Sequence, residues 1–256
     1  MTESESTWCY GQVKSNALNV RREPSRKARR WNNVWPMNRL VLVKPCGVDG
    51  WYETLYRGET AYVMAEFIKL LDEPVPVSIV ERMLFMAQPE NGRSKSIYFN
   101  GYGGKWCHRF ADWLAMNAGM NNDTIPNTSN CGKGIVWFAT HENSDGFFFR
   151  SKEHKQRMCR AYSALVNQDP ELTEDEASFL PSPGDYVYFR WKKAAASVNV
   201  SHVGIVASVD GECLTTWEGN AGSKVSQRSY VLNDSQIVGY GHPRYSYMTN
   251  GDKIAS

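Results

Sequence analysis

No stretch of the chain approaches the roughly 20 consecutive apolar residues that a membrane-spanning helix needs, so the sequence predicts no membrane span. A secretory signal with a basic start and an apolar middle is also missing, because the first seven residues are polar and acidic. The protein therefore either leaves its cell by another route or has lost its signal. Strong charge is lacking too: 29 basic against 27 acidic residues leave a net charge of +2. A dedicated nucleic-acid binder usually has a larger basic excess, so we expect no nucleic-acid partner.

The cysteines form no C-x-x-C pair, which argues against zinc-ribbon and zinc-finger sites. A chain of this length does not need a disulfide scaffold either. We therefore expect most of the six thiols to be buried or idle, and one of them to need a different explanation. They are Cys9, Cys46, Cys107, Cys131, Cys159 and Cys213.

Residues 8–72 have the alternation and the turn signals of several short strands. Many short strands within about 65 residues predict a small all-β barrel. Pro74 and Pro76 follow, and they oppose both helix and central strand, so residues 73–77 are predicted to be a stiff linker. The expected strands are residues 17–21, 40–44, 50–55 and 59–63.

Four short motifs follow one another in this segment: Leu18-Asn19-Val20-Arg21, Pro24-Ser25, Gly50-Trp51-Tyr52 and Ala61-Tyr62-Val63. In this order they resemble the bacterial SH3-like domain, in which the Leu-Asn-Val-Arg and Gly-Trp-Tyr strands recur. Members of that family commonly bind cell-wall peptides. The resemblance therefore implies an SH3-like barrel with a wall-binding role over residues 8–72.

A basic cluster lies in the same segment. A solvated loop is the default interpretation of such a cluster. A sharper hypothesis is contact with anionic polymers of the cell wall, such as teichoic acids. Nucleic acid is the weaker alternative, because no RNA- or DNA-binding motif accompanies the cluster. Its members are Arg21, Arg22, Arg26, Lys27, Arg29 and Arg30.

The clearest helix signal covers residues 106–116, where apolar residues recur at helical spacing and Gly119 provides a stop. Cys107 then falls in the first helical turn. A thiolate at that place is favoured by the unpaired amides and the helix dipole, and the same amides can stabilise an oxyanion. For a cysteine taken alone, burial on an amphipathic helix is the commoner explanation, so the case depends on its partners.

A cysteine nucleophile needs a base, and the base needs an orienting group. His202 opens a strand predicted over residues 202–209, and the next strand runs back over residues 212–218. Glu218 and Asn220 close that second strand. These two acceptors are two residues apart, so they point to the same face of the sheet.

The turn decides whether the histidine shares that face. With a two-residue loop at residues 210–211, both acceptors lie on the face opposite to His202. With a three-residue bulged loop that pairs Ser208 with Glu212, His202 lies opposite Glu218. A catalytic site therefore predicts the three-residue loop, and a two-residue turn without any other bulge would remove Glu218 from the site.

Four further motifs occur in a fixed order: Trp106-Cys107-His108-Arg109-Phe110 with Trp113, Pro183-Gly184-Asp185, His202-Val203-Gly204-Ile205-Val206 and Glu218-Gly219-Asn220. They resemble the CHAP family of cysteine, histidine-dependent amidohydrolases and peptidases, over roughly residues 78–243. The resemblance implies a papain-like α+β fold and cleavage of amide bonds in peptidoglycan. The related NlpC-type wall peptidases share that fold, but their nucleophile motif is usually Asp-Cys-Ser rather than Trp-Cys.

The resemblance also implies roles for particular residues. Cys107 corresponds to the nucleophile, His202 to the general base, and Glu218 and Asn220 to the polar partners of the histidine. No cofactor is required. Three aromatic residues border the site in sequence and are candidates for lining a substrate groove, with core packing as an equal alternative. They are Tyr102, Trp106 and Trp217.

Some phage CHAP enzymes bind calcium through an acidic loop just before the cysteine, whereas residues 98–104 contain no carboxylate here. We therefore predict no metal at that place. His108 is expected at the surface or behind the site, because neighbouring helical residues diverge by about 100°. His242 has no visible partner. Residues 140–180 match no known pattern and read as a loop-rich insertion.

These observations together predict an SH3-like domain at residues 8–72, a linker at 73–77, a CHAP-like papain-fold domain at 78–245 and a disordered tail at 246–256. The expected function is peptidoglycan hydrolysis at the bacterial cell wall, by a phage lysin or a host autolysin, through an acyl-enzyme on Cys107. Two alternatives stay open. One is a catalytically inactive wall-binding module, and the other is an amidase acting on a small soluble amide conjugate.

Overall fold

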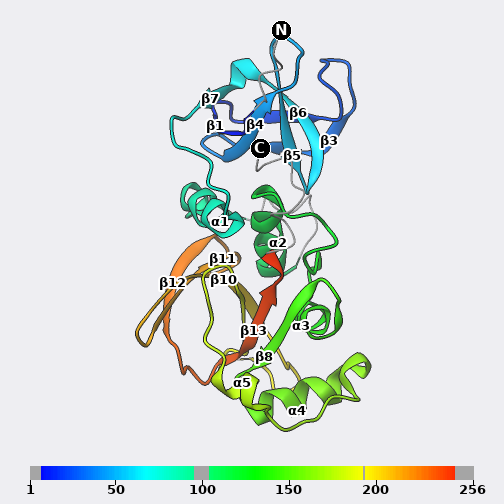
Figure 1. Ribbon diagram of the computed structural model, residues 1–256, viewed down its shortest axis with the longest axis vertical. Coiled ribbons are helices and arrows are strands. Elements are labelled where there is room, and N and C mark those ends of the chain that lie inside the picture. Colours follow the sequence, from blue (N-terminus) through cyan, green and yellow to red (C-terminus); the bar gives the residue numbers. More distant parts are fainter. Residues whose placement is uncertain (1–6, 95–103, 193, 246–256) are drawn as a thin grey trace. The chain divides into compact units, whose positions relative to one another are not determined.

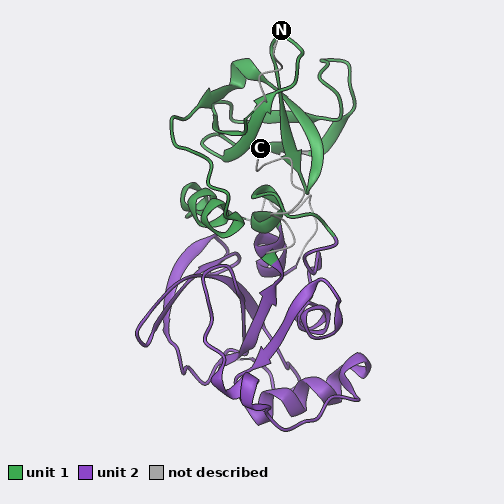
Figure 2. Ribbon diagram, viewed as in Figure 1, with its two compact units in different colours: residues 1–102, 113–122, 245–256 green, residues 103–112, 123–244 purple. Residues whose placement is uncertain are grey.

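The computed structural model describes residues 7–94, 104–192 and 194–245 (Figure 1). The chain forms two compact units, which are described separately. Unit 1 comprises residues 1–102, 113–122 and 245–256, and unit 2 comprises residues 103–112 and 123–244 (Figure 2). Helix α2 (Cys107–Asn117) contributes its first turns to unit 2 and its last turns to unit 1. The domain boundaries expected from the sequence stay a prediction, and the predicted tail at 246–256 lies outside the described residues.

Unit 1 is built on a seven-stranded antiparallel sheet with the order β3-β2-β6-β5-β4-β1-β7. Its apolar core includes Val20, Trp35, Val43 and Val63, each of which is buried. The strands are β1 (Cys9–Val13), β2 (Leu18–Arg21), β3 (Arg30–Trp35), β4 (Leu40–Pro45), β5 (Trp51–Tyr56), β6 (Glu59–Met64) and β7 (Ile68–Leu70), with a 3-10 turn η1 (Ala65–Phe67) before β7.

All four strands expected from the sequence are present as β2, β4, β5 and β6, within about two residues of their predicted ends. The sequence did not indicate β1, whose central Gly11 lets the strand approach β7: a Cβ there would lie 2.6 Å from Ile68. Among the described pairings none joins β3 to β7, so the sheet is not closed into a barrel. The likeness to an SH3-like domain therefore stays a prediction, and the structure establishes an antiparallel sheet.

Helix α1 (Ile79–Ala87) follows this sheet. Ser78 caps it, with its side chain accepting from the Glu81 N–H at 3.3 Å. Phe85 packs its ring 4.7 Å from that of Tyr10 in β1. The 3-10 turn η2 (Gln88–Glu90) then ends in Glu90, whose buried carboxylate binds Arg39.

Unit 2 contains a six-stranded antiparallel sheet with the order β12-β11-β10-β9-β13-β8. The last strand in sequence, β13, lies between β9 and β8 in this sheet. The strands are β8 (Ser144–Phe149), β9 (Tyr186–Phe189), β10 (His202–Asp210), β11 (Cys213–Glu218), β12 (Ser226–Val231) and β13 (Ile237–Pro243).

Helix α3 packs against β8 and β13, and α4 and α5 pack against β8 (Figure 1). The expectation of a loop-rich stretch after residue 140 is therefore wrong, because β8 and two helices lie there. Cap residues mark these helices: Asn130 accepts from the Lys133 N–H and Ser151 from the His154 N–H. The helices are α3 (Cys131–Thr140), α4 (Lys152–Ala161) and α5 (Glu174–Ser178), with a 3-10 turn η4 (Ser163–Leu165).

The structure is thus mixed α/β, with an antiparallel sheet in its N-terminal part. In the parts of the chain that are described, no helix combines the length and the apolar character that crossing a membrane requires.

Candidate active site

Cys107 is the first residue of α2, as the sequence predicts, and its side chain is buried. The helix ends at Asn117, and Gly119 follows with φ 118°, a backbone conformation that suits glycine. The first N–H groups of a helix have no acceptor within the helix. The nucleophile candidate therefore lies where negative charge is favoured.

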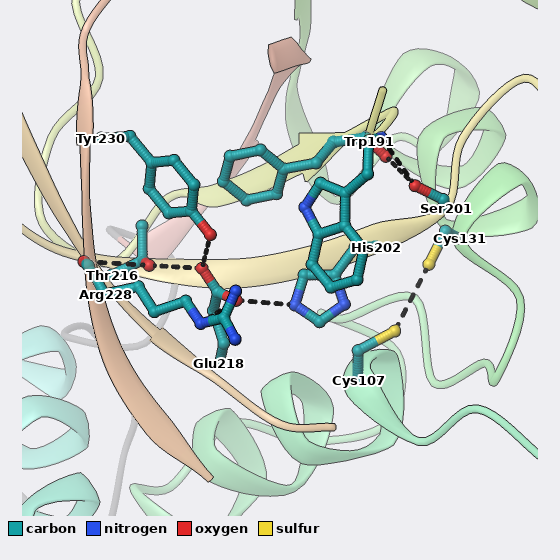
Figure 3. A network of polar contacts seen from close by, with 10 residues as sticks. Cys107, Cys131, Trp191, Ser201, His202, Thr216, Glu218, Arg228 and Tyr230 are labelled. Atoms are coloured by element: carbon teal, nitrogen blue, oxygen red, sulfur yellow. Dashed lines mark hydrogen bonds and ion pairs between the residues drawn. The ribbon is translucent and has the colours of Figure 1, made fainter. Parts of the chain in front are cut away.

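His202 is the first residue of β10 and is also buried. Its Nε2 lies 2.8 Å from Glu218 Oε2, at the end of β11. Figure 3 shows the imidazole between the Glu218 carboxylate and the Cys107 sulfur. The structure therefore brings together three of the four predicted catalytic residues, in the order nucleophile, base and orienting group.

The β10–β11 hairpin differs from both loops considered in the sequence analysis. Asp210 pairs with Cys213, so the loop consists of Gly211 and Glu212, and the predicted three-residue loop is wrong. The register shifts by one residue between Val206 and Ser208. Because a slip of one residue moves side chains to the opposite face, this bulge is what places Glu218 on the face of His202.

The Glu218 carboxylate is buried and accepts further hydrogen bonds. Thr216 Oγ1 donates to its Oε1 at 2.8 Å and Tyr230 OH donates to the same oxygen at 2.7 Å. Burial raises the pKa of Glu218, but the hydrogen bonds from His202, Tyr230 and Thr216 together with the charge of His202 outweigh burial and lower it. Glu218 is thus held ionised and fixed in direction.

Trp191 stacks on the His202 imidazole, with ring centroids 4.3 Å apart and planes 29° from parallel (Figure 3). The Trp191 N–H also donates to Ser201 Oγ at 3.0 Å. Sequence reasoning missed Trp191 and gave Tyr230 no role in the site. Each comes from a strand or loop that only the folded sheet places beside His202 or Glu218.

Cys107 and His202 shift each other's protonation. The hydrogen bond with Cys131, followed by the hydrogen bond and the charge of His202, holds the pKa of the Cys107 thiol well below its ordinary value despite burial. Burial lowers the pKa of His202, but its hydrogen bonds with Cys107 and Glu218 outweigh burial and raise it to about 9. The pair therefore favours a thiolate beside an imidazolium, which is the reactive state of a cysteine nucleophile.

Residues 97–220 match a family model described as the CHAP domain. This segment is a CHAP domain. It holds Cys107, His202 and Glu218, and it covers α2, α3 and the β10–β11 hairpin. The match agrees with the resemblance seen in the sequence. A comparison with curated proteins finds no match.

Three solved structures are similar to this chain over different shares of its length. NlpC2 from Trichomonas vaginalis is 18% identical with a TM-score of 0.33, covering 93% of this chain and 72% of its own. NlpC1 from the same organism is 19% identical with a TM-score of 0.33, covering 93% and 69%. The structure titled Ly7917 is 30% identical over 27% of this chain and 30% of its own, with a TM-score of 0.23.

A second cysteine of the CHAP domain faces the first. Cys131 is the first residue of α3, and its Sγ lies 3.7 Å from that of Cys107. Both thiols are free. Cys131 is among the thiols expected to be buried or idle, and it is buried. Its contact with Cys107 is not evident from the sequence, because 24 residues separate the two and no spacing rule connects them.

His108 belongs to a buried network directly behind the nucleophile. Its Nδ1 lies 3.0 Å from Asp112 Oδ2 and its Nε2 lies 2.8 Å from Tyr188 OH. Burial lowers the pKa of His108, but the charge of Asp112 and the hydrogen bond with it raise the pKa overall. The expectation of a surface position is wrong, and the alternative of a place behind the site is correct.

Two positions in the CHAP motifs require glycine because a larger side chain would clash with its neighbours. A Cβ on Gly204 would lie 2.8 Å from Glu218 Cγ, so this glycine leaves room for the orienting carboxylate. A Cβ on Gly219 would lie 2.3 Å from Phe110 Cβ, so the end of β11 packs closely against α2. These positions bring the strand and the helix close enough for the site to form.

The remaining predicted site residues are placed differently. Asn220 adopts φ 61° in the turn after β11, and no hydrogen bond in the described part of the chain joins it to His202. Trp106 and Trp217 are 1% and 7% exposed. Their role in binding substrate stays a prediction, and in this structure both support the site from the interior. Tyr102 lies outside the described residues.

The stretch predicted to lack a calcium site, residues 98–104, also lies outside the described residues except for Gly104. His242 does have a partner: its Nδ1 bonds Asp185 Oδ1, so the expectation that it has none is wrong. Asp185 belongs to the Pro183-Gly184-Asp185 motif and also accepts from the Ser182 N–H at 2.7 Å. This pair ties β13 to the start of β9.

A cavity of about 250 Å³ lies beside Cys131. Its walls are mostly polar and combine one cation with hydroxyl and amide groups. Ser201, which directly precedes His202 in the chain, is part of its wall. Among the lining residues are Lys105, Asn130, Cys131, Tyr162, Asn199 and Ser201.

Proposed function

We propose that this protein is a peptidoglycan hydrolase, an amidase or endopeptidase that cuts an amide bond of the bacterial cell wall by a thiol mechanism. The observation that carries the proposal is the buried series Cys107, His202 and Glu218, each bound to the next. The CHAP domain supports it, because that family consists of cysteine, histidine-dependent amidohydrolases and peptidases.

In this mechanism His202 holds the proton of Cys107 and Glu218 fixes the imidazole. The thiolate attacks the carbonyl carbon, and the N–H groups at the start of α2 stabilise the oxyanion. His202 then gives its proton to the leaving amine, and a thioester forms on Cys107. Water, activated by His202, releases the acyl group as a carboxylate and restores the thiol.

The cavities favour an extended substrate. Tyr162 lines the 250 Å³ cavity and also a second cavity of about 550 Å³, whose lining includes Trp137 and Lys133. A peptide attached to a polymer can occupy both, whereas a small conjugate needs only one. This arrangement supports a wall polymer as the substrate.

Unit 1 is proposed to bind the wall, with the basic cluster contacting its anionic polymers. Part of that cluster is already engaged: Arg22 lies over the Trp31 ring at 3.7 Å, and Arg21 donates to Ala28 O at 2.8 Å. Lys27 and Arg29 have exposed side chains and are the members proposed to meet wall polymers. The site of action is then the bacterial cell wall.

Fragment release from purified peptidoglycan tests this function. Wild type is compared with Cys107→Ala, with Cys213→Ala as the control because Cys213 is an exposed thiol on the hairpin. We expect fragments with new amine and carboxyl ends from wild type and the control only. No release from walls of several chemotypes, together with turnover of a small amide conjugate, would support the small-substrate alternative. No turnover of either would support a binding module.

A further inference from the structure

The Cys107–Cys131 pair lies where helices α2 and α3 begin, because each cysteine is the first residue of its helix. Figure 3 shows the two sulfur atoms pointing toward each other, with His202 beside Cys107. Their separation of 3.7 Å is a hydrogen-bond distance for sulfur. Cys107 is fully buried and Cys131 is 8% exposed, so water contributes little to solvating either sulfur.

Simultaneous ionisation of both cysteines is unfavourable, because two buried thiolates at that distance repel each other strongly. The charges of His202 and His108 favour ionisation of Cys107. The hydrogen bond with Cys107 and burial raise the pKa of Cys131 well above its ordinary value. The pair therefore keeps one proton, and that proton stays on Cys131.

We propose that Cys131 is a positioning residue whose thiol donates a hydrogen bond to the Cys107 sulfur, stabilising it as a thiolate directed toward His202. The inference rests on the proposed role of Cys107 as the nucleophile. It assigns a function to a cysteine that would otherwise be an idle buried thiol.

The N-terminal turn of α3 is shaped to hold Cys131 in place. Asn130 caps the helix by accepting from the Lys133 N–H at 3.0 Å. A Cβ on Gly132 would lie 1.6 Å from Tyr162 OH, and a Cβ on Gly134 would lie 2.1 Å from His108 Nε2. Glycine at position 134 therefore lets this turn approach His108 on α2, and glycine at position 132 leaves room for Tyr162.

Several other titratable groups influence the protonation of the cysteine pair, so its pH response depends on all of them. Those acting on Cys107 lie on α2 and β10, and those acting on Cys131 lie before α2, on α2, between α4 and η4, and on β9. They are His108, His202, Lys105, Asp112, Tyr162 and Tyr188. All of these side chains are retained when Cys131 alone is replaced. A shift of the Cys107 titration in that variant therefore reports the loss of the Cys131 thiol.

Alkylation of Cys107 tests the proposal without any wall substrate. The full chain, kept reduced by a phosphine, is treated with limiting iodoacetamide over a wide pH range, and peptide mass spectrometry separates Cys107 from Cys131. In Cys131→Ala we expect the midpoint of Cys107 alkylation to rise by about one pH unit, the usual scale for losing a hydrogen bond to a charged group. Cys131→Ser keeps a donor and is expected to restore part of the shift.

Cys213→Ala is the matched control and should leave the midpoint unchanged, since that thiol is exposed. An unchanged midpoint in both Cys131 variants would overturn the proposal. So would faster alkylation of Cys131 than of Cys107 in wild type, a comparison that depends on no variant folding. A shifted midpoint without fragment release from walls would uphold this inference and reject the proposed substrate.

Discussion

Three hydrogen bonds converge on the Glu218 carboxylate, from His202, Thr216 and Tyr230. Each oxygen is thus fixed, and the imidazole can point its other nitrogen only toward Cys107. This residue-scale arrangement supports the proposal that Glu218, rather than Asn220, orients the imidazole.

Glu218→Gln should therefore reduce hydrolysis by roughly 10²–10⁴-fold, the usual contribution of general acid–base catalysis, because it loses the charge that supports the imidazolium. It should also lower the pKa of His202 from about 9. Measured kcat/KM against pH should show a basic limb at lower pH than in wild type. Glu212→Gln, an exposed carboxylate in the same hairpin, is the control. Equal loss in Asn220→Gly would contradict the assignment.

The protonation of the pair predicts two different pH profiles. The thiolate exists above the lowered pKa of Cys107, and the imidazolium exists below about 9. Amide cleavage needs both, because the leaving amine takes a proton from His202. We expect hydrolysis to fall as pH rises through about 9, while alkylation of Cys107 stays high. A parallel fall of both rates would argue against His202 as the acid.

At this scale the sequence indicated Cys107, His202 and Glu218, because residue type, helix position and motif order point to them. It gave no role in the site to Cys131, Trp191 or Tyr230. Each of these reaches the site only through the packing of elements far apart in the chain. No periodicity or spacing carries that information.

Secondary-structure elements position the site through close backbone approach. Gly204 in β10 lies against the Glu218 side chain of β11, and the bulge between Val206 and Ser208 sets the face on which Glu218 emerges. The backbone geometry of the hairpin therefore determines the direction in which the Glu218 carboxylate points.

Gly204→Ala should displace Glu218, because the new Cβ would lie 2.8 Å from its Cγ. We expect a loss of activity of about tenfold or more and a cost in stability of about 1–3 kcal/mol, the usual range for overpacking. Gly211→Asn in the same hairpin is the matched control, since its surroundings are open and Asn tolerates its φ of 55°. Kinetics and urea unfolding of both variants measure the difference. Wild-type activity in Gly204→Ala would contradict this role.

The elements themselves were predictable where periodicity was strong. The strands β2, β4, β5 and β6 and the helix α2 lie close to the predicted residues. The hairpin loop was predicted wrongly, because Asp210-Gly211 is a common turn pair and the choice of Gly211-Glu212 depends on a bulge further along β10. The segment from α3 to α4 was missed although Asn130 and Ser151 marked both helix starts.

At the scale of the whole molecule, a buried ion pair between residues far apart in the sequence stabilises unit 1. Arg39 Nε and Nη2 each lie 3.2 Å from a Glu90 oxygen, and these residues are 51 positions apart and fully buried. The Arg39 guanidinium also lies 4.4 Å from the Trp113 ring centre. The pair therefore ties the sheet to η2 and α2 within this unit.

Glu90→Ala should destabilise the protein by about 3–5 kcal/mol, because it leaves the Arg39 charge buried without its partner. The double variant Arg39→Met/Glu90→Leu should recover most of that loss, since both charges are gone. Thermal and urea unfolding of the three proteins measure the effect. A change of less than about 0.5 kcal/mol in Glu90→Ala would show that the pair does not support the fold.

The central claim is that Cys107 carries the acyl group of a wall peptide. The most direct measurement is acid quenching during turnover of a purified peptidoglycan fragment, followed by mass spectrometry of the Cys107 peptide. The account predicts an acyl adduct on Cys107 in wild type, and none in His202→Ala or on Cys131. Fragment release that persists in Cys107→Ala, or an adduct on another residue, would contradict it.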